Sequence, residues 1–265
     1  MNLTTQQVAE LEDSNYATLA AIAQVTPGMS LIQRDDVIII CNPAFPIPDT
    51  THACRLRTTP QNADGLIAEV TEYFKSQDLP VTVILSPACA PADLPDRLLK
   101  CGFVRQEAED AWLTLDDVPN VPIPPLIPSA EVRSVNGEEA ETYAAVYMAA
   151  FEMPLEFAPY MAERMQPVMN LPGFYHYIAF IDGQPAGVCS LYCNGTLGIL
   201  GSTGVIPAYR RGGAATNLGI RAVADAQKQG VRTVVVQTTG GTSFERFILM
   251  SGFKKAFTRI CYTLP

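Results

Sequence analysis

A proline-rich run in the middle of the chain, residues 119–128, constrains the fold more than any other feature. Five of its ten residues are proline: Pro119, Pro122, Pro124, Pro125 and Pro128. Each proline fixes its own φ angle and restricts the residue before it, so the run forms an extended, semi-rigid connector. The 265-residue chain is thereby divided into two halves of ordinary domain size. The sequence predicts domains over residues 1–118 and 131–265, joined by a linker over residues 119–130.

Composition and charge exclude several classes of protein. Hydrophobic residues make up 48% of the chain, which indicates a sizeable core, and the formal net charge is −9. Nucleic acids and anionic membranes would be repelled by this charge, although a local basic patch could still bind one small anion. No apolar run is long enough to cross a bilayer, and no leader is visible at the start of the sequence. We expect a cytoplasmic protein without nucleic-acid or membrane partners, and leave open whether it is a monomer or a homodimer.

Cysteine and histidine usage predicts no metal site. The seven cysteines contain no Cys-x-x-Cys motif, and neither His52 nor His176 has other metal-ligating residues clustered around it. Reduced, mostly buried thiols fit a cytosolic setting. Both histidines are expected in packed or surface positions.

The two halves end in the same order of elements, namely a strand, a helix, a Gly-Phe pair and a final strand. Gly after a helix suits a left-handed turn, and the Phe can pack back on the core. In the first half these elements are residues 81–85, 93–100, Gly102-Phe103 and 111–115. In the second half they are residues 233–237, 243–250, Gly252-Phe253 and 258–263. The shared order and spacing favour a diverged tandem repeat.

The second half is predicted to be a mixed α/β sheet with helices on its faces, because its elements read β-α-α-β-β-β-α-β-α-β. Asp182-Gly183 is a strong hairpin signal between two of the strands. The elements that precede the shared ending are strands at 131–135, 174–181, 185–193 and 197–205, and helices at 138–151, 155–169 and 213–229.

The stretch from Gly204 to Ala215 indicates an anion-binding turn. An apolar strand ends at Pro207, and a small-residue turn opens directly into a long helix. The first backbone N–H groups of that helix lack intrahelical partners, and the helix dipole adds partial positive charge. Neither a Walker-type loop nor a dinucleotide-binding glycine pattern is present.

These residues resemble a known family. Arg210-x-x-Gly213-x-Ala215 matches the Arg/Gln-x-x-Gly-x-Gly/Ala signature of the GNAT acetyltransferases. The segment Val205-x-Pro207-x-Tyr209-Arg210-Arg211 matches the lead-in that is typical of the signature. The resemblance covers residues 131–265. It implies the GNAT acyl-CoA N-acyltransferase fold, an α/β fold with a mixed sheet, in a tandem arrangement whose N-terminal half is a degenerate copy.

The resemblance also implies a cofactor and a reaction. Acetyl-CoA would be the co-substrate, and the strand that ends at Val205 would part from its neighbour and pair with the pantetheine arm. An amine of a small molecule or peptide would then attack the thioester directly. The groups expected to hold the pyrophosphate are the side chains of Arg210 and Arg211 and the backbone of Gly212, Gly213, Ala214 and Ala215.

The acid and base of the family do not carry over. The position where many members have a tyrosine is Ile248 here, and residues 199–205 contain no carboxylate. Glu152 and Glu156 are candidates for binding or deprotonating the amine, with solvated surface carboxylates as the plainer interpretation. Ser243 and Tyr262 are candidates for protonating the leaving thiolate. Ser243 is equally consistent with a helix cap and Tyr262 with a half-buried strand residue.

The N-terminal half shows no cofactor signature, since residues 60–70 open a helix without the Arg/Gln-x-x-Gly-x-Gly/Ala pattern. It is predicted to have lost the pyrophosphate site. An alternative for the whole chain is a non-catalytic acyl-CoA-binding or interaction module, which would bind coenzyme A without transferring acetyl groups.

Overall fold

The computed structural model describes residues 3–265 and forms two compact units; residues 1–2 of the predicted N-terminal domain lie outside the described part. The first unit holds the described residues up to Leu113 together with Gln237–Pro265, and the second holds Thr114–Val236. The predicted domain bounds at residues 118 and 131 stay a prediction.

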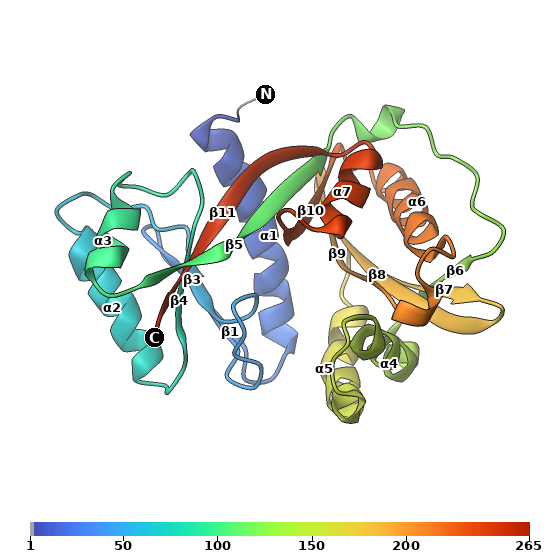
Figure 1. The fold of residues 1–265 in the computed structure, drawn as a ribbon, viewed down its shortest axis with the longest axis horizontal. Helices are drawn as coiled ribbons and strands as arrows, with labels where there is room; N and C mark the ends of the chain where they lie inside the picture. The colour runs from blue at the N-terminus through green and yellow to red at the C-terminus, as the bar shows by residue number, and fades with distance from the viewer. Residues whose placement is uncertain (1–2) are drawn as a thin grey trace. The chain divides into compact units, whose positions relative to one another are not determined.

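The sheet of the first unit contains strands from both ends of the sequence. The C-terminal strand β11 pairs antiparallel with β4, with Tyr262 opposite Val83, and it lies between β4 and β5 (Figure 1). The spatial order is β1 (Ser30–Gln33), β2 (Ile38–Cys41), β3 (His52–Cys54), β4 (Val81–Leu85), β11 (Lys254–Leu264) and β5 (Val104–Leu115), of which residues 104–113 belong to this unit.

Helices cover both faces of this sheet. On one face, Phe74 of α2 (Ala63–Lys75) and Leu98 of α3 (Leu94–Lys100) share a core with Val83. On the other, Tyr16 of α1 (Thr5–Val25) packs against β2. The helix α7 (Ser243–Met250) belongs to the same unit.

The sheet of the second unit has the spatial order β10-β9-β8-β7-β6. All pairings are antiparallel except that of β9 with β10, which is parallel. The hairpin turn at Asp182-Gly183 is confirmed, with φ values of 50° and 73°. The strands are β6 (Glu131–Val135), β7 (Phe174–Ile181), β8 (Gln184–Asn194), β9 (Leu197–Val205) and β10 (Thr233–Thr239), whose last three residues fall outside this unit.

The helices of the second unit lie on opposite faces of its sheet. A Cβ at Gly187 would contact Leu218 of α6 (Ala214–Lys228), whereas the next residue, Val188, packs with Tyr143 of α4 (Ala140–Ala150). The helix α5 (Ala158–Met169) packs on the α4 side (Figure 1). The predicted α/β architecture with a mixed sheet is confirmed. Four 3₁₀ turns complete the unit: η1 (Val118–Asn120), η2 (Gly137–Glu139), η3 (Leu155–Phe157) and η4 (Pro207–Tyr209).

Neither membrane-spanning helices nor metal-ligand clusters occur in residues 3–265. No helix there combines the length and apolar character needed to cross a bilayer. No group of three or more His, Cys, Asp and Glu side chains is placed to hold a metal ion. All seven cysteines are unpaired.

Candidate functional site

The turn that opens α6 has an unusual backbone. Arg211 and Gly213 have φ values of 71° and 87°, both in the left-handed region, and Gly213 is the N-cap residue. Only glycine adopts this conformation at little cost, which explains why position 213 is glycine. The two left-handed residues redirect the chain from η4 into the helix axis.

The first amides of α6 have no protein acceptor. The first bond of the helix runs from the Asn217 N–H to the Gly213 carbonyl oxygen, over 3.0 Å. Within residues 3–265, no carbonyl or side chain accepts the N–H groups of residues 213–216. Such a row at the positive end of a 15-residue helix is suited to an anion.

Packing on the inner side of the turn also requires small residues. A Cβ on Gly212 would lie 2.7 Å from the Cδ1 atom of Ile181, and one on Gly213 would lie 3.1 Å from Ile127. The Ser129 hydroxyl donates to the Gly212 carbonyl over 2.9 Å. Ile127 and Ser129, at the end of the proline-rich linker, therefore contact the inner side of the turn and help to hold its conformation.

The two arginines of the turn differ in their surroundings. Arg210 donates from Nε to the Val205 carbonyl over 3.2 Å and forms a 3.0 Å ion pair with Glu152. Arg211 is exposed, and within the described residues its side chain has no hydrogen-bond or ion-pair partner. The charge of Arg211 is thus available to an anion, while that of Arg210 is partly balanced.

The strand that leads into the turn has free backbone groups. β9 pairs with β10 only as far as Leu200 opposite Val236, yet it continues to Val205. Ser202 has a φ of 49° at an irregularity in the β8–β9 register. A bulge of this kind re-aims backbone groups next to a site. The last five residues of β9 can therefore bind an extended ligand through the main chain, except at the Val205 and Gly201 carbonyls, which already accept from Arg210 and from the Thr203 hydroxyl.

A row of aromatic side chains runs along α4 toward β9. Tyr143, Tyr147 and Phe151 are four residues apart, and the Tyr147 and Phe151 ring centroids are 4.6 Å apart. The Phe151 ring packs on Gly204, where an added Cβ would lie 2.9 Å from it. The i, i+4, i+8 spacing of these residues is visible in the sequence, but no site was predicted from it.

The buried end of the row is polar. The Tyr143 ring meets that of His176 edge-on, with centroids 5.3 Å apart. Within residues 3–265, neither ring nitrogen of His176 nor the Tyr143 hydroxyl has a hydrogen-bond partner. Burial lowers the pKa of His176 to about 4, and burial together with the nearby Cys189 raises the pKa of Tyr143. Both side chains are therefore uncharged at neutral pH, and His176 occupies a packed position as predicted.

Acidification from pH 7 to pH 5 is expected to destabilise the protein partly through His176. Between the folded pKa of about 4 and an unfolded pKa of about 6.5, the unfolded chain binds a proton that the folded chain does not. Stability therefore falls as the pH falls through this window. Denaturant unfolding should show the wild type losing about 1–2 kcal/mol more than His176→Phe. Equal losses in the two proteins would contradict the assignment, because His52 and the carboxylates are common to both.

Comparison with known proteins identifies the domain. A family model described as Acetyltransferase (GNAT) family matches residues 142–243, which run from α4 to the start of α7 and include the turn that opens α6. Residues 142–243 are a GNAT domain. No curated protein sequence matches the chain.

Solved structures share the fold over nearly the whole chain. A GCN5-related N-acetyltransferase from Kribbella flavida superposes with a TM-score of 0.71 and 14% identity, covering 100% of this chain and 96% of that one. A tandem GNAT protein from the clavulanic acid biosynthesis pathway gives a TM-score of 0.64 and 16% identity, covering 93% and 86%. A GCN5-related N-acetyltransferase from Sphaerobacter thermophilus gives 0.60 and 16%, covering 93% and 92%. The predicted tandem GNAT fold, with an N-terminal GNAT-like half, is confirmed.

In the GNAT-like N-terminal half, the strand edge that corresponds to the free edge of β9 is paired with other backbone groups of the same half. Beyond the short parallel pairing of β3 with β4, the Ala90 N–H donates to the Leu56 carbonyl over 2.8 Å, and the Thr58 N–H donates to the Ala90 carbonyl over 3.0 Å. Backbone groups that would meet an extended ligand are thus paired within the chain. The first turn of α2 also carries Asp64, which disfavours an anion there.

The predicted catalytic candidates lie in different units. Ser243 and Tyr262 belong to the first unit, where Thr242 rather than Ser243 caps α7 and Tyr262 is buried beside β4. Glu152 and Glu156 are exposed in the GNAT domain. Of these four, only Glu152 touches the turn that opens α6, through Arg210.

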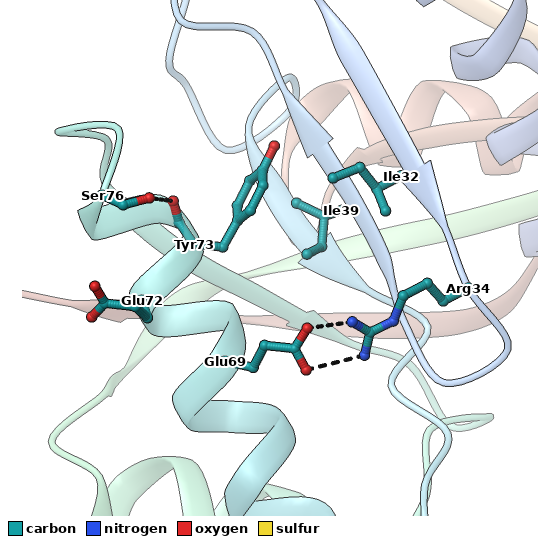
Figure 2. A pocket seen from close by; sticks show the side chains of 7 residues that line it. All are labelled: Ile32, Arg34, Ile39, Glu69, Glu72, Tyr73 and Ser76. Carbon is teal, nitrogen blue, oxygen red and sulfur yellow. Dashed lines mark hydrogen bonds and ion pairs between the residues drawn. The ribbon is translucent and has the colours of Figure 1, made fainter.

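A separate hollow of about 360 Å³ lies in the first unit between α2 and the β1–β2 hairpin (Figure 2). Its wall carries the Arg34–Glu69 ion pair, and Arg34 also bonds Asp36 over 2.9 Å. The Arg34 cation is thus already paired with two carboxylates, unlike the unpaired Arg211 side chain at the turn that opens α6.

Proposed function

We propose that this protein transfers the acetyl group of acetyl-CoA to an amine of a small molecule or peptide. The observation that carries the proposal is the turn that opens α6, with its unpaired amides at residues 213–216 and the unpaired Arg211. Pyrophosphate fits both features, because it is an anion that accepts several hydrogen bonds. The main chain of β9 from Gly201 to Val205 would bind the pantetheine arm.

The transfer itself is a direct displacement. The lone pair of the amine nitrogen attacks the thioester carbonyl carbon, a C–N bond forms, and the C–S bond breaks. The sulfur leaves as a thiolate and gains a proton, while the nitrogen loses one. Backbone N–H groups near the Ser202 bulge would stabilise the developing oxyanion. Holding the amine beside the thioester supplies much of the rate without a side-chain acid.

Glu152 and Glu156 are the carboxylates we assign to the acceptor. Each would attract an ammonium group and could accept its proton. Glu152 would do so while bound to Arg210, so Glu156 is the better candidate. Ser243 and Tyr262 take no part in this proposal. The seven unpaired cysteines support a reducing compartment such as the cytoplasm.

Ala215→Glu is expected to weaken acetyl-CoA binding by about thirtyfold or more. Residue 215 lies in the first turn of α6, where a carboxylate is compatible with folding but would repel pyrophosphate. Isothermal titration of acetyl-CoA into wild type and variant measures the change.

Gly219→Glu is the matched control. It adds the same charge about one turn further along the same helix, where a Cβ would meet nothing within 4 Å, and its affinity should change by less than about threefold. Absence of binding by the wild type, or equal losses in both variants, would contradict the proposal.

The alternative is a non-catalytic acyl-CoA-binding module. Ile248 at the usual tyrosine position and the lack of a carboxylate on β9 favour it. Binding of acetyl-CoA without release of free thiol in the presence of any amine would decide for this alternative.

A further inference from the structure

The segment that joins α4 to α5 exposes an apolar patch, which consists of Phe151, Leu155, Phe157 and Tyr160. Phe151 and Phe157 are 43% and 54% exposed. Four large apolar side chains within ten residues are costly to leave in water, and such clusters mark binding sites. Glu152 is in the left-handed region at φ 56°, and this turn carries the chain from α4 toward η3.

The patch is continuous with the candidate site. The Phe151 ring lies against Gly204, within the stretch of β9 whose edge has no ladder partner in this unit. A molecule that covers Phe151 therefore brings its reactive end next to the proposed thioester position. An apolar surface far from β9 could not place a bound molecule beside the proposed thioester position.

Charge is distributed unequally around the patch. Glu152 and Glu156 lie within it and are exposed, and Glu156 has no ion-pair partner among residues 3–265. At the other end, the Arg164 guanidinium lies over the Tyr160 ring, 4.3 Å from its centroid. The charge of Glu152 is partly balanced by Arg210, so the Glu156 carboxylate is the group that attracts an ammonium ion to this segment.

We propose that the apolar patch binds the hydrocarbon body of the acceptor, so that the acceptor is a primary amine carried on an aryl or alkyl group. This inference rests on the proposed function for its reaction but adds the class of substrate. The body covers Phe151 and Phe157, and the amine is held near Gly204 by the neighbouring glutamates.

Acceptor preference is the first test. With saturating acetyl-CoA, thiol release is measured for 2-phenylethylamine, ethylamine and spermidine. Burial of the phenyl ring should give 2-phenylethylamine a kcat/KM at least about tenfold above that of ethylamine. It should also exceed spermidine, which carries more charge but no apolar body. Equal values, or a preference for spermidine, would overturn the inference while leaving acetyl transfer intact.

Variants locate the preference on the patch. Phe151→Ala and Phe157→Ala should each lower kcat/KM for 2-phenylethylamine by about tenfold, mainly through KM. Phe157→Ala should leave kcat/KM for ethylamine nearly unchanged. Ile123→Ala is the matched control, because Ile123 is an apolar linker residue that is 40% exposed. Loss of activity toward both amines alike would indicate a structural role and would count against the inference.

Binding without turnover separates this inference from the proposed function. 2-Phenylethylamine is titrated into protein saturated with coenzyme A, where no acetyl group can move. Binding that Phe157→Ala weakens supports the patch even when thiol release fails. Absence of binding overturns the inference.

Light scattering provides the remaining test: a dimer that both Phe variants dissociate would assign the patch to a second copy of this chain instead.

Discussion

Replacing Asn217 with alanine should lower the free energy of unfolding by about 2–4 kcal/mol. Asn217 is fully buried in the first turns of α6. Its Oδ1 accepts the Ile127 N–H over 2.9 Å, and its Nδ2 donates to the carbonyls of Ile127 and Ala130 over 2.9 and 2.6 Å. Alanine leaves the partly buried Ile127 N–H and the buried Ala130 carbonyl without their side-chain partner, whereas the Ile127 carbonyl still accepts the Ala130 N–H over 3.2 Å. Each group left unpaired costs about 1–3 kcal/mol.

The same substitution should weaken acetyl-CoA binding. Ile127, which Asn217 holds, packs behind Gly213, so release of the linker removes the support of the turn. Denaturant unfolding and isothermal titration measure the two effects. Asn120→Ala is a suitable control, because Asn120 is an exposed linker residue whose side chain, among residues 3–265, bonds only Asp117, over 2.9 Å. A loss for Asn217→Ala as small as that of the control would contradict this role.

Local sequence signals predicted the GNAT domain well because each acts over a few residues. Asp182-Gly183 specifies its hairpin through positive φ angles, and Gly230 ends α6 with a φ of 75°. The turn at 210–215 was recognisable because its small residues and arginines are adjacent in sequence. In these regions the elements predicted from the sequence agree closely with those of the structure.

Other features depend on contacts between distant residues. Nothing near Glu152 indicates that it pairs with Arg210, which is 58 residues away. The helix α1 was not predicted, because its buried face includes Glu12, Ser14 and Asn15 and so lacks an apolar period. Only its Thr4–Gln7 capping box was readable. The position of β11 between β4 and β5 is likewise set by non-local pairing rather than by its own residues.

Arg259→Met is the second substitution with a large expected effect, a loss of about 3–5 kcal/mol of folding free energy. Arg259 of β11 is buried and forms an ion pair with Asp110 of β5 over 2.6 Å. It also donates to the Tyr16 hydroxyl over 3.3 Å and lies over the Trp112 ring, 4.8 Å from its centroid. Methionine keeps most of the side-chain length but leaves the partly buried Asp110 carboxylate without its cation.

Thermal and denaturant unfolding of three variants separate the ion pair from packing. Arg105→Ala is the control, because it removes an arginine from an exposed ion pair with Glu109 of the same strand and should cost less than about 0.5 kcal/mol. Adding Asp110→Asn to Arg259→Met should recover part of the loss, since the unpaired charge is gone. A double variant no more stable than Arg259→Met would assign the loss to packing around Trp112.

The location of Arg259 bears on how the chain can be divided. Its partners Tyr16 and Asp110 lie before the proline-rich linker, whereas Arg259 itself lies near the C-terminus. A fragment that ends at residue 118 would lack β11, so β4 and β5 would lose the strand between them and Asp110 would lose its cation. The backbone groups of β4 that pair with β11 would then be exposed. We therefore expect this fragment to fail to fold, and circular dichroism of the fragment with and without a peptide of residues 254–264 would measure whether the missing strand restores structure.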